Sequence, residues 1–196
     1  MITSFIKIVG NKKQQIIFQP PKTKTLKFIY RNSNKLVSSE TIQLNLPTII
    51  FFEDEYCSDM DAFEGFYAAA VNHNPFLEKY VEQPLFYNLP FPHCGANGRI
   101  CNGEAENYHL INKIKQFWTT PFSFCEMDPN IRELEYNKRW GTYGKDVKDF
   151  HANLLGFLKN WNNMKFEEQF SMSFKIEENL QGYITKGLKE YGYQNI

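Results

Sequence analysis

The sequence predicts an α+β fold in which an antiparallel meander sheet is followed by helices. Up to Val71, apolar residues alternate with polar ones or form short runs that end at turn residues, as they do in β-strands. After Gly103, apolar residues recur at spacings of three and four, which is typical of one face of a helix. No repeat or change of composition marks a linker, so residues 1–196 are predicted to form a single domain.

Six strands are expected, each bounded by turn residues. They are Phe5–Val9, Ile16–Phe18, Leu26–Tyr30, Ile42–Leu44, Thr48–Phe52 and Phe66–Val71. The apolar run at Thr48–Phe52 is typical of a buried strand. The run at Phe66–Val71 also fits a helix, but Asn72–Pro75 stops it early and favours a strand. The acidic residues Glu53–Glu55 are interpreted as a solvated loop.

Three helices are expected in the second half of the chain. The first starts near Glu104 and stops before Pro121, because a proline disfavours helical geometry in the residue before it. The second covers residues 145–161, where apolar residues form an amphipathic pattern. A third, weaker pattern covers Ile176 to Leu188. Strands that precede helices favour segregated layers.

The charge and cysteine content argue against several classes of protein. Lys plus Arg and Asp plus Glu both number 22, so the net charge is zero and a large basic nucleic-acid surface is not expected. No apolar run approaches the length of about eighteen residues that a membrane span needs, and Met1–Gln15 lacks the pattern of a signal peptide. Four cysteines are too few for a disulfide framework, so we expect free thiols in the cytoplasm.

The stretch Leu89–Gly103, with the sequence LPFPHCGANGRICNG, is the expected functional segment. Its prolines exclude a helix and its glycines indicate turns, and irregular segments between apolar blocks commonly carry function. The chain lacks paired metal ligands at C-x2-C spacing, Gly-rich phosphate motifs and a G-x-S-x-G nucleophile elbow. We therefore expect no metal and no cofactor, and the remaining candidate nucleophile is a cysteine.

Cys101 is that candidate. The turn Asn97-Gly98-Arg99 precedes it, and the Arg99 cation would favour its thiolate. A cysteine that follows an apolar residue such as Ile100 is also often simply buried. The residue pattern alone leaves both interpretations open.

The stretch resembles the active-site motif of ubiquitin-conjugating enzymes, in which a His-Pro-Asn tripeptide precedes Gly-x-Ile-Cys. Here Phe91-Pro92-His93 takes the place of the tripeptide. The eight residues from His93 to Cys101 equal the family's interval from Asn to the catalytic cysteine. Pro92, Gly98, Ile100 and Cys101 then fall on the family's positions without a gap.

More specifically, the chain is similar to the bacterial branch called PRTRC system protein B or prokaryotic family D. The end of that branch's motif, Val/Ile-Cys-x-Gly, is matched by Ile100–Gly103. A helix with an aromatic pair before a Phe-Ser segment resembles Phe117–Phe124, and a later helix resembles Phe150–Leu158. The resemblance spans about residues 45–185. It implies a ubiquitin-conjugating fold whose usual N-terminal helix is replaced by strands, with residues 1–45 as an extension of that fold.

The resemblance implies an enzyme that carries a ubiquitin-like protein as a thioester on Cys101 and transfers it to an amine. Its partners would be the ubiquitin-like protein, a ThiF-like adenylating enzyme and a JAB-type deconjugating peptidase, in a bacterial pathway such as anti-phage defence. His93 occupies the position of the family's Asn, where it would donate to the oxyanion, shuttle a proton or only stabilise the loop. Asn97 would shape the turn, and Asp128 would orient an incoming lysine.

Two other functions stay open. A catalytically inactive binding or scaffold module for a ubiquitin-like protein or an operon partner would explain the loss of the motif's His and Asn. An unrelated Cys-His hydrolase would need a base near Cys101, and the sequence does not show whether His93, His109 or His151 lies close to it.

Overall fold

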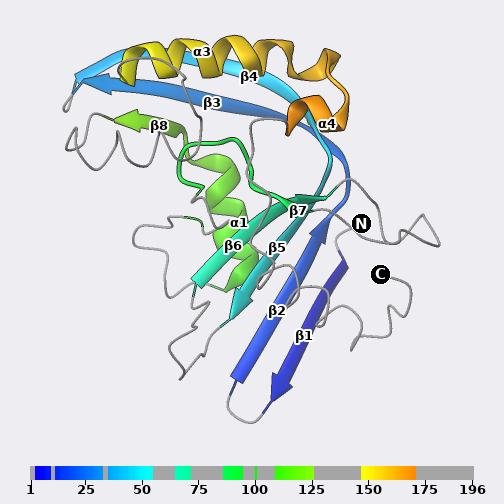
Figure 1. The fold of residues 1–196 in the computed structure, drawn as a ribbon. Coiled ribbons are helices and arrows are strands. Elements are labelled where there is room, and N and C mark those ends of the chain that lie inside the picture. The colour runs from blue at the N-terminus through cyan, green and yellow to red at the C-terminus, as the bar shows by residue number, and fades with distance from the viewer. Residues whose placement is uncertain are drawn as a thin grey trace.

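The computed structural model describes residues 3–9, 12–32, 35–54, 65–71, 86–94, 100, 109–125 and 147–170. Within these residues the chain forms a five-stranded sheet, a three-stranded sheet and helices that pack against them (Figure 1). This mixture confirms the predicted α+β class.

The five-stranded sheet has the order β1-β2-β5-β6-β7, and every neighbouring pair in it is antiparallel. Its strands are β1 (Thr3–Val9), β2 (Lys12–Gln19), β5 (Thr48–Asp54), β6 (Gly65–Val71) and β7 (Phe86–Tyr87). All residues from Thr48 to Glu53 and from Phe66 to Val71 are buried. Because successive side chains of a strand point to opposite faces, both faces of the sheet are covered here. The expected buried strand at Thr48–Phe52 is confirmed.

The three-stranded sheet has the order β4-β3-β8. Its strands are β3 (Lys22–Asn32), β4 (Lys35–Leu46) and β8 (Phe122–Cys125). Strands β3 and β4 form an antiparallel hairpin, whereas β3 and β8 are parallel. In β4 the buried residues Ile42, Leu44 and Leu46 alternate with exposed ones, so one face of this strand is solvated.

The expected single antiparallel meander is wrong. Strands β3 and β4 leave the first sheet between β2 and β5 and build the second sheet, and β8 joins that sheet in parallel after a helix. Strands and helices are therefore not segregated along the chain. The physical reason is that a period of two shows which residues share a buried face but does not show which strand lies beside them.

The helices are α1 (Leu110–Thr119), α3 (Val147–Asn160) and the short α4 (Phe166–Gln169), with a 3-10 turn, η2 (Trp161–Asn163), after α3. Helix α1 ends before Pro121 as predicted but begins later than Glu104, because His109 is its N-cap and has an extended backbone. Residues 101–108 and the expected C-terminal helix lie outside the described residues. Helix α3 and its 3-10 turn confirm the predicted helix at 145–161. None of the described helices has the length and apolar character needed to cross a membrane.

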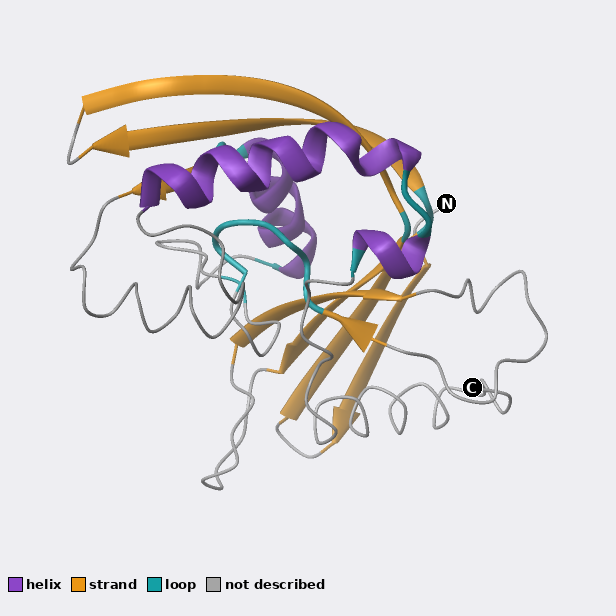
Figure 2. Ribbon diagram, turned by 45° about the horizontal axis from the view of Figure 1, so that its top comes forward, coloured by secondary structure: helices purple, strands orange, loops and turns teal. Residues whose placement is uncertain are grey.

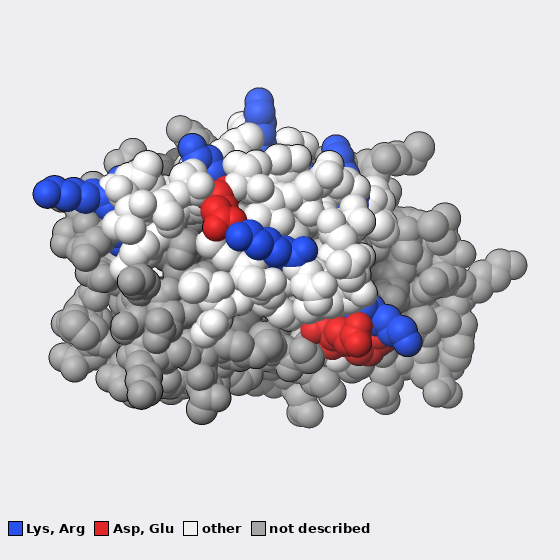
Figure 3. Space-filling model, turned by 90° about the horizontal axis from the view of Figure 1, so that it is seen from above, with Lys and Arg blue, Asp and Glu red and all other residues white. Residues whose placement is uncertain are grey.

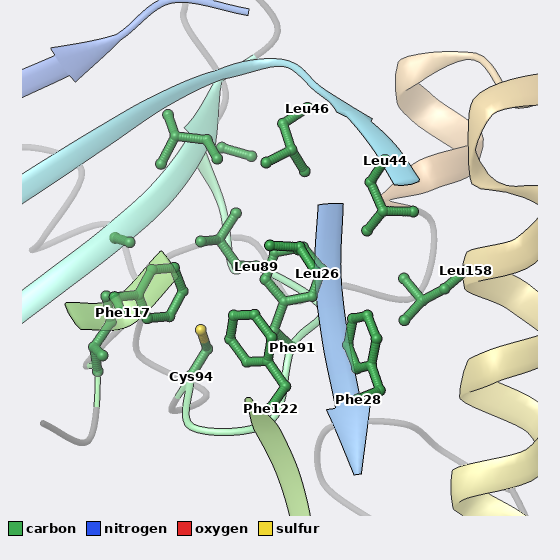
Figure 4. Packing of buried hydrophobic residues seen from close by; sticks show 14 of the residues in the cluster. Leu26, Phe28, Leu44, Leu46, Leu89, Phe91, Cys94, Phe117, Phe122 and Leu158 are labelled. Atoms are coloured by element: carbon green, nitrogen blue, oxygen red, sulfur yellow. The ribbon is translucent and has the colours of Figure 1, made fainter. Parts of the chain in front are cut away.

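One cluster of buried apolar residues joins both sheets and the helices. Phe117 of α1 contacts Phe51 of β5 and Phe122 of β8 at ring-centroid distances of 5.9 and 5.3 Å. Figure 2 shows α1 between the two sheets and α3 along the β3–β4 hairpin. In Figure 4, Leu158 of α3 points toward Phe28 of β3 from the side opposite Phe122. Four residues of the stretch Leu89–Gly103 belong to this cluster, namely Leu89, Phe91, Cys94 and Ile100.

Candidate functional site

Cys101, Asn97 and Asp128, three of the four predicted site residues, lie outside the described residues. Their predicted roles remain predictions. The fourth, His93, lies within the described residues 86–94, and Ile100 is described as well. The site is therefore built from residues 86–94 and 100, the described residues that precede the candidate nucleophile in the chain, which we call the frame.

Phe91 anchors this frame in the core. Its side chain is 1% exposed, and its ring lies 5.0 Å from that of Phe122 and 6.2 Å from that of Phe28. Trp118 of α1 approaches the same ring edge-on at 6.4 Å. Phe91 therefore packs in the core against residues of both β3 and β8 and of α1.

The chain turns sharply at His93. The Cys94 N–H donates to the Phe91 carbonyl oxygen at 3.2 Å, and His93 has φ 73°, the left-handed region that non-glycine residues seldom adopt. Such a conformation persists only where the surrounding structure enforces it. The buried Phe91 on one side and the buried Cys94 on the other supply that enforcement.

The imidazole of His93 is held by strand β8. The Ser123 N–H donates to His93 Nε2 at 3.4 Å, and the ring lies 5.9 Å from the ring of Phe122. Because Nε2 accepts, the proton of the neutral ring is assigned to Nδ1. Burial lowers the pKa of His93 from its usual 6.5, since desolvation disfavours the charged form. His93 is thus a neutral imidazole with its N–H at Nδ1.

The two ends of segment 95–99 are fastened together. Cys94 and Ile100 form an isolated antiparallel bridge, and the Ile100 N–H donates to the carbonyl oxygen of Phe66 in β6 at 2.7 Å. Cys94, which had no assigned role, is 2% exposed, and in Figure 4 its sulfur points between Phe117 and Phe91. The frame therefore fixes the residue directly before Cys101.

A buried ion pair lies near this frame and was missed by sequence reasoning. Glu53, expected in a solvated loop, belongs to β5, is 5% exposed and pairs with Lys113 of α1. That expectation is wrong because β5 continues past the apolar run. The available signals were the alternation of Ile49, Phe51 and Glu53 and the position of Lys113 on the apolar stripe of its helix.

The sequence also offered His109 and His151 as bases for Cys101, and neither is placed relative to Cys101 by the described residues. His109 is exposed at the N-cap of α1, and the side chain of His151 in α3 is not described. No group of three or more His, Cys, Asp or Glu side chains that could hold a metal ion occurs among the described residues.

Charged side chains are scattered over the face seen in Figure 3, where basic and acidic groups of described residues alternate. The ion pair between Lys159 and Glu40, with an N–O distance of 2.7 Å, joins α3 to β4 and is largely exposed.

Comparison of the chain with protein-family models, with curated proteins and with solved structures gives no match.

Proposed function

We propose that this protein is a ubiquitin-conjugating-like enzyme that carries a ubiquitin-like protein on Cys101 and transfers it to an amine. The fold would be a variant of the ubiquitin-conjugating fold in which N-terminal strands replace the first helix. The pathway would be a bacterial, cytoplasmic one, with a ThiF-like adenylating enzyme as donor and a JAB-type peptidase as the reversing activity.

The observation that carries the proposal is the fastening of the motif segment on both sides of residues 95–99. Phe91 and Cys94 are buried in the core, and Ile100 is bonded to β6. The segment follows the last strand of an antiparallel sheet and precedes a helix, which is the order that the resemblance implies. A nucleophile gains most from a scaffold that is rigid before the substrate arrives.

The bridge favours a partnership between His93 and Cys101. It pairs Cys94 with Ile100, and each of the two candidate residues is one residue away along the chain from a member of the bridge. The Nδ1–H of His93 would then serve as the donor that the family's Asn supplies, whether to the oxyanion or to the loop.

The chemistry consists of two acyl transfers. In the first, the Cys101 thiolate attacks the activated C-terminal carbonyl of the ubiquitin-like protein, a C–S bond forms, and the leaving group departs with the electron pair of the bond that breaks. In the second, an amine attacks the thioester, an amide C–N bond forms, and the C–S bond breaks with its electron pair on the Cys101 sulfur. The proton that the amine loses passes through solvent to the released thiolate. Neutral His93 would donate to the oxyanion of either intermediate, and no cofactor is needed.

A second candidate is a binding module that keeps the fold without catalysis. The observation that favours it is that Nε2 of His93 already accepts from Ser123, so this nitrogen is occupied by the structure. A module of this kind would still bind the ubiquitin-like protein but would never become charged with it.

A charging assay separates these functions. The wild-type protein, incubated with ATP, the adenylating enzyme and the ubiquitin-like protein, should form an adduct that a thiol reductant cleaves. The Cys101→Ser variant should form an adduct that resists the reductant, because an oxygen ester replaces the thioester. Cys94→Ser is the matched control and should leave a cleavable adduct. No adduct with an adenylating enzyme that is itself charged would overturn the proposal and leave the binding module.

The role of His93 is tested in the same assay. His93→Ala should slow discharge to lysine more than charging if its N–H serves the oxyanion of aminolysis. Equal loss of charging and discharge would instead assign His93 to holding the loop. Genes for an adenylating enzyme and a JAB-type peptidase beside this gene would support the pathway, including a place on a mobile element or defence island.

A further inference from the structure

Helix α1 packs with a side that is not the centre of its apolar side. The apolar side is formed by Leu110, Ile111, Ile114, Phe117 and Trp118. The buried residues of the helix are Leu110, Lys113 and Phe117. At about 100° per residue, the centre of this buried set lies about 60° around the helix from the centre of the apolar side. The helix is therefore rotated away from the packing that its apolar residues alone favour.

Two margins of the helix show what this rotation costs. Ile111 belongs to the apolar side and is nevertheless 59% exposed. At the opposite margin Lys113 is buried, and Oε1 of Gln116 is buried with no hydrogen-bond partner among the described residues. A buried polar atom without a partner is unfavourable. A turn toward the centre of the apolar side would bury Ile111 and bring Gln116 and the Lys113 ammonium to solvent, so another interaction holds the helix as it is.

The ion pair of Lys113 with Glu53 is that interaction. Glu53 follows Phe51 by two residues and so lies on the same face of β5. Lys113 precedes Phe117 by four residues and so lies on the same side of α1. The rings of Phe51 and Phe117 are in contact, with centroids 5.9 Å apart. The two spacings are similar, about 7 Å along the strand and about 6 Å along the helix, so the ion pair forms one step beyond this ring contact.

A buried ion pair restricts the orientation of the helix more than it stabilises the fold. The cost of removing both charges from water offsets most of their attraction, whereas separating them leaves a buried charge without a partner. The neighbour of Glu53 on β2, its register partner Gln15, is 8% exposed and uncharged. Lys113 therefore has one charged partner among the described residues, and a rotation of α1 separates it from that partner.

We propose that the Glu53–Lys113 ion pair sets the rotation of α1 about its own axis and keeps Ile111 at the surface. Without the pair, α1 adopts a second packing, turned by about 60°, in which its apolar side faces the sheet. Trp118 contacts Phe91 of the frame at a ring-centroid distance of 6.4 Å, so the rotation also determines which side of α1 the frame packs against. The inference is independent of the proposed enzymatic function.

The test is hydroxyl-radical footprinting of the purified full chain, with oxidation of the side chains of α1 quantified by mass spectrometry. Glu53→Leu leaves Lys113 buried without a partner and should turn the helix. Ile111 then takes the place that the partly buried Ile114 holds now, so its oxidation rate should fall about twofold. Phe117, which is 5% exposed, moves to the edge of the buried side and should be oxidised about threefold faster.

Two further variants separate a rotation from other effects. Glu53→Lys combined with Lys113→Glu exchanges the partners, keeps an ion pair at the same place and should restore both wild-type rates. Gln15→Leu adds an apolar side chain beside Glu53 without removing a charge and should leave both rates unchanged. Opposite changes at Ile111 and Phe117 identify a rotation, because a loosened fold would raise both rates.

Three results would overturn the inference: unchanged rates in Glu53→Leu, rates that change in the same direction, or an exchange variant that keeps the Glu53→Leu pattern. The same pattern in Gln15→Leu would also overturn it, because that variant retains the ion pair. If Glu53→Leu does not fold, the near-isosteric Glu53→Gln also leaves Lys113 unpaired and decides by the same two rates. Footprinting requires no ubiquitin-like protein, so its outcome is separate from that of the charging assay.

Discussion

The strands of the two sheets of this protein are buried to different extents. In the five-stranded sheet, β5 and β6 are buried residue after residue, so their backbone and both their faces are enclosed. In the three-stranded sheet, β4 buries alternate residues and leaves the others in solvent, and Leu36 and Val37 near its start are 59% and 56% exposed. Both sheets contribute to the candidate site, since Ile100 is bonded to β6 of the enclosed sheet and His93 accepts from Ser123 of β8 in the open sheet.

At the edges of the open sheet, main-chain N–H and C=O groups form hydrogen bonds with side chains and not with a further strand. Asn162 donates through Nδ2 to the Gln43 carbonyl oxygen at 2.9 Å, and its Oδ1 accepts from the Asn45 N–H at 2.7 Å. The Trp161 indole N–H donates to the Asn45 carbonyl oxygen at 2.8 Å. At the other edge, His93 accepts from Ser123 of β8. Where no neighbouring strand covers an edge, individual side chains thus supply hydrogen-bond partners for single main-chain groups of that edge.

The largest expected effect tests the enclosed sheet. Phe51→Ala removes a ring that is 0% exposed and contacts Phe66, Phe117 and Trp118. It should lower the free energy of unfolding by about 3–5 kcal/mol, because a cavity is left in a closely packed core. Thr41→Ala, on the exposed side of β4, is the matched control and should change it by less than about 0.5 kcal/mol. Chemical denaturation measures both. Similar losses would contradict the division between an enclosed and an open sheet.

A smaller effect is expected at the edge of β4. Asn162→Ala removes two hydrogen bonds to the main chain at an exposed position and should cost about 1 kcal/mol in the free energy of unfolding. Amide hydrogen exchange at Asn45 should become faster. Asn163→Ala is the control, since that side chain bonds only the side chain of Asn160 in the described part of the structure. Unchanged exchange at Asn45 would show that Asn162 does not protect the edge.

The smallest expected effect depends on pH and concerns His93 at the edge of β8. The unfolded chain binds a proton near pH 6.5, whereas the folded chain does so only at lower pH because burial lowers the pKa of His93. The free energy of unfolding should therefore decrease as the pH falls below about 6.5 and level off below the folded pKa. His93→Asn should remove this part of the decrease. An identical pH slope in wild type and variant, measured by denaturation, would contradict a buried neutral imidazole.

Much of the local structure could be predicted from the residues. The strands around Thr48–Phe52 and Phe66–Val71 are predicted from continuous apolar runs, and the helix over 145–161 from the period that burial of one face imposes. The absence of a helix at Pro90 and Pro92 is predicted from the prolines, and the described residues around them form none. Glu53 was misplaced because charge at the end of an apolar run usually marks a loop, and its partner Lys113 is 60 residues away in the chain.

The sequence by itself determined which apolar runs and faces are buried and which segment is irregular, because these properties depend on side-chain polarity and on local backbone geometry. The tertiary structure decided which strands are neighbours, that β8 joins β3 in parallel, and that Glu53 meets Lys113 beside the residue that holds the motif segment. Those outcomes depend on contacts between segments far apart in the chain. A pattern of polarity specifies that a face must be covered, and only the packed structure selects what covers it.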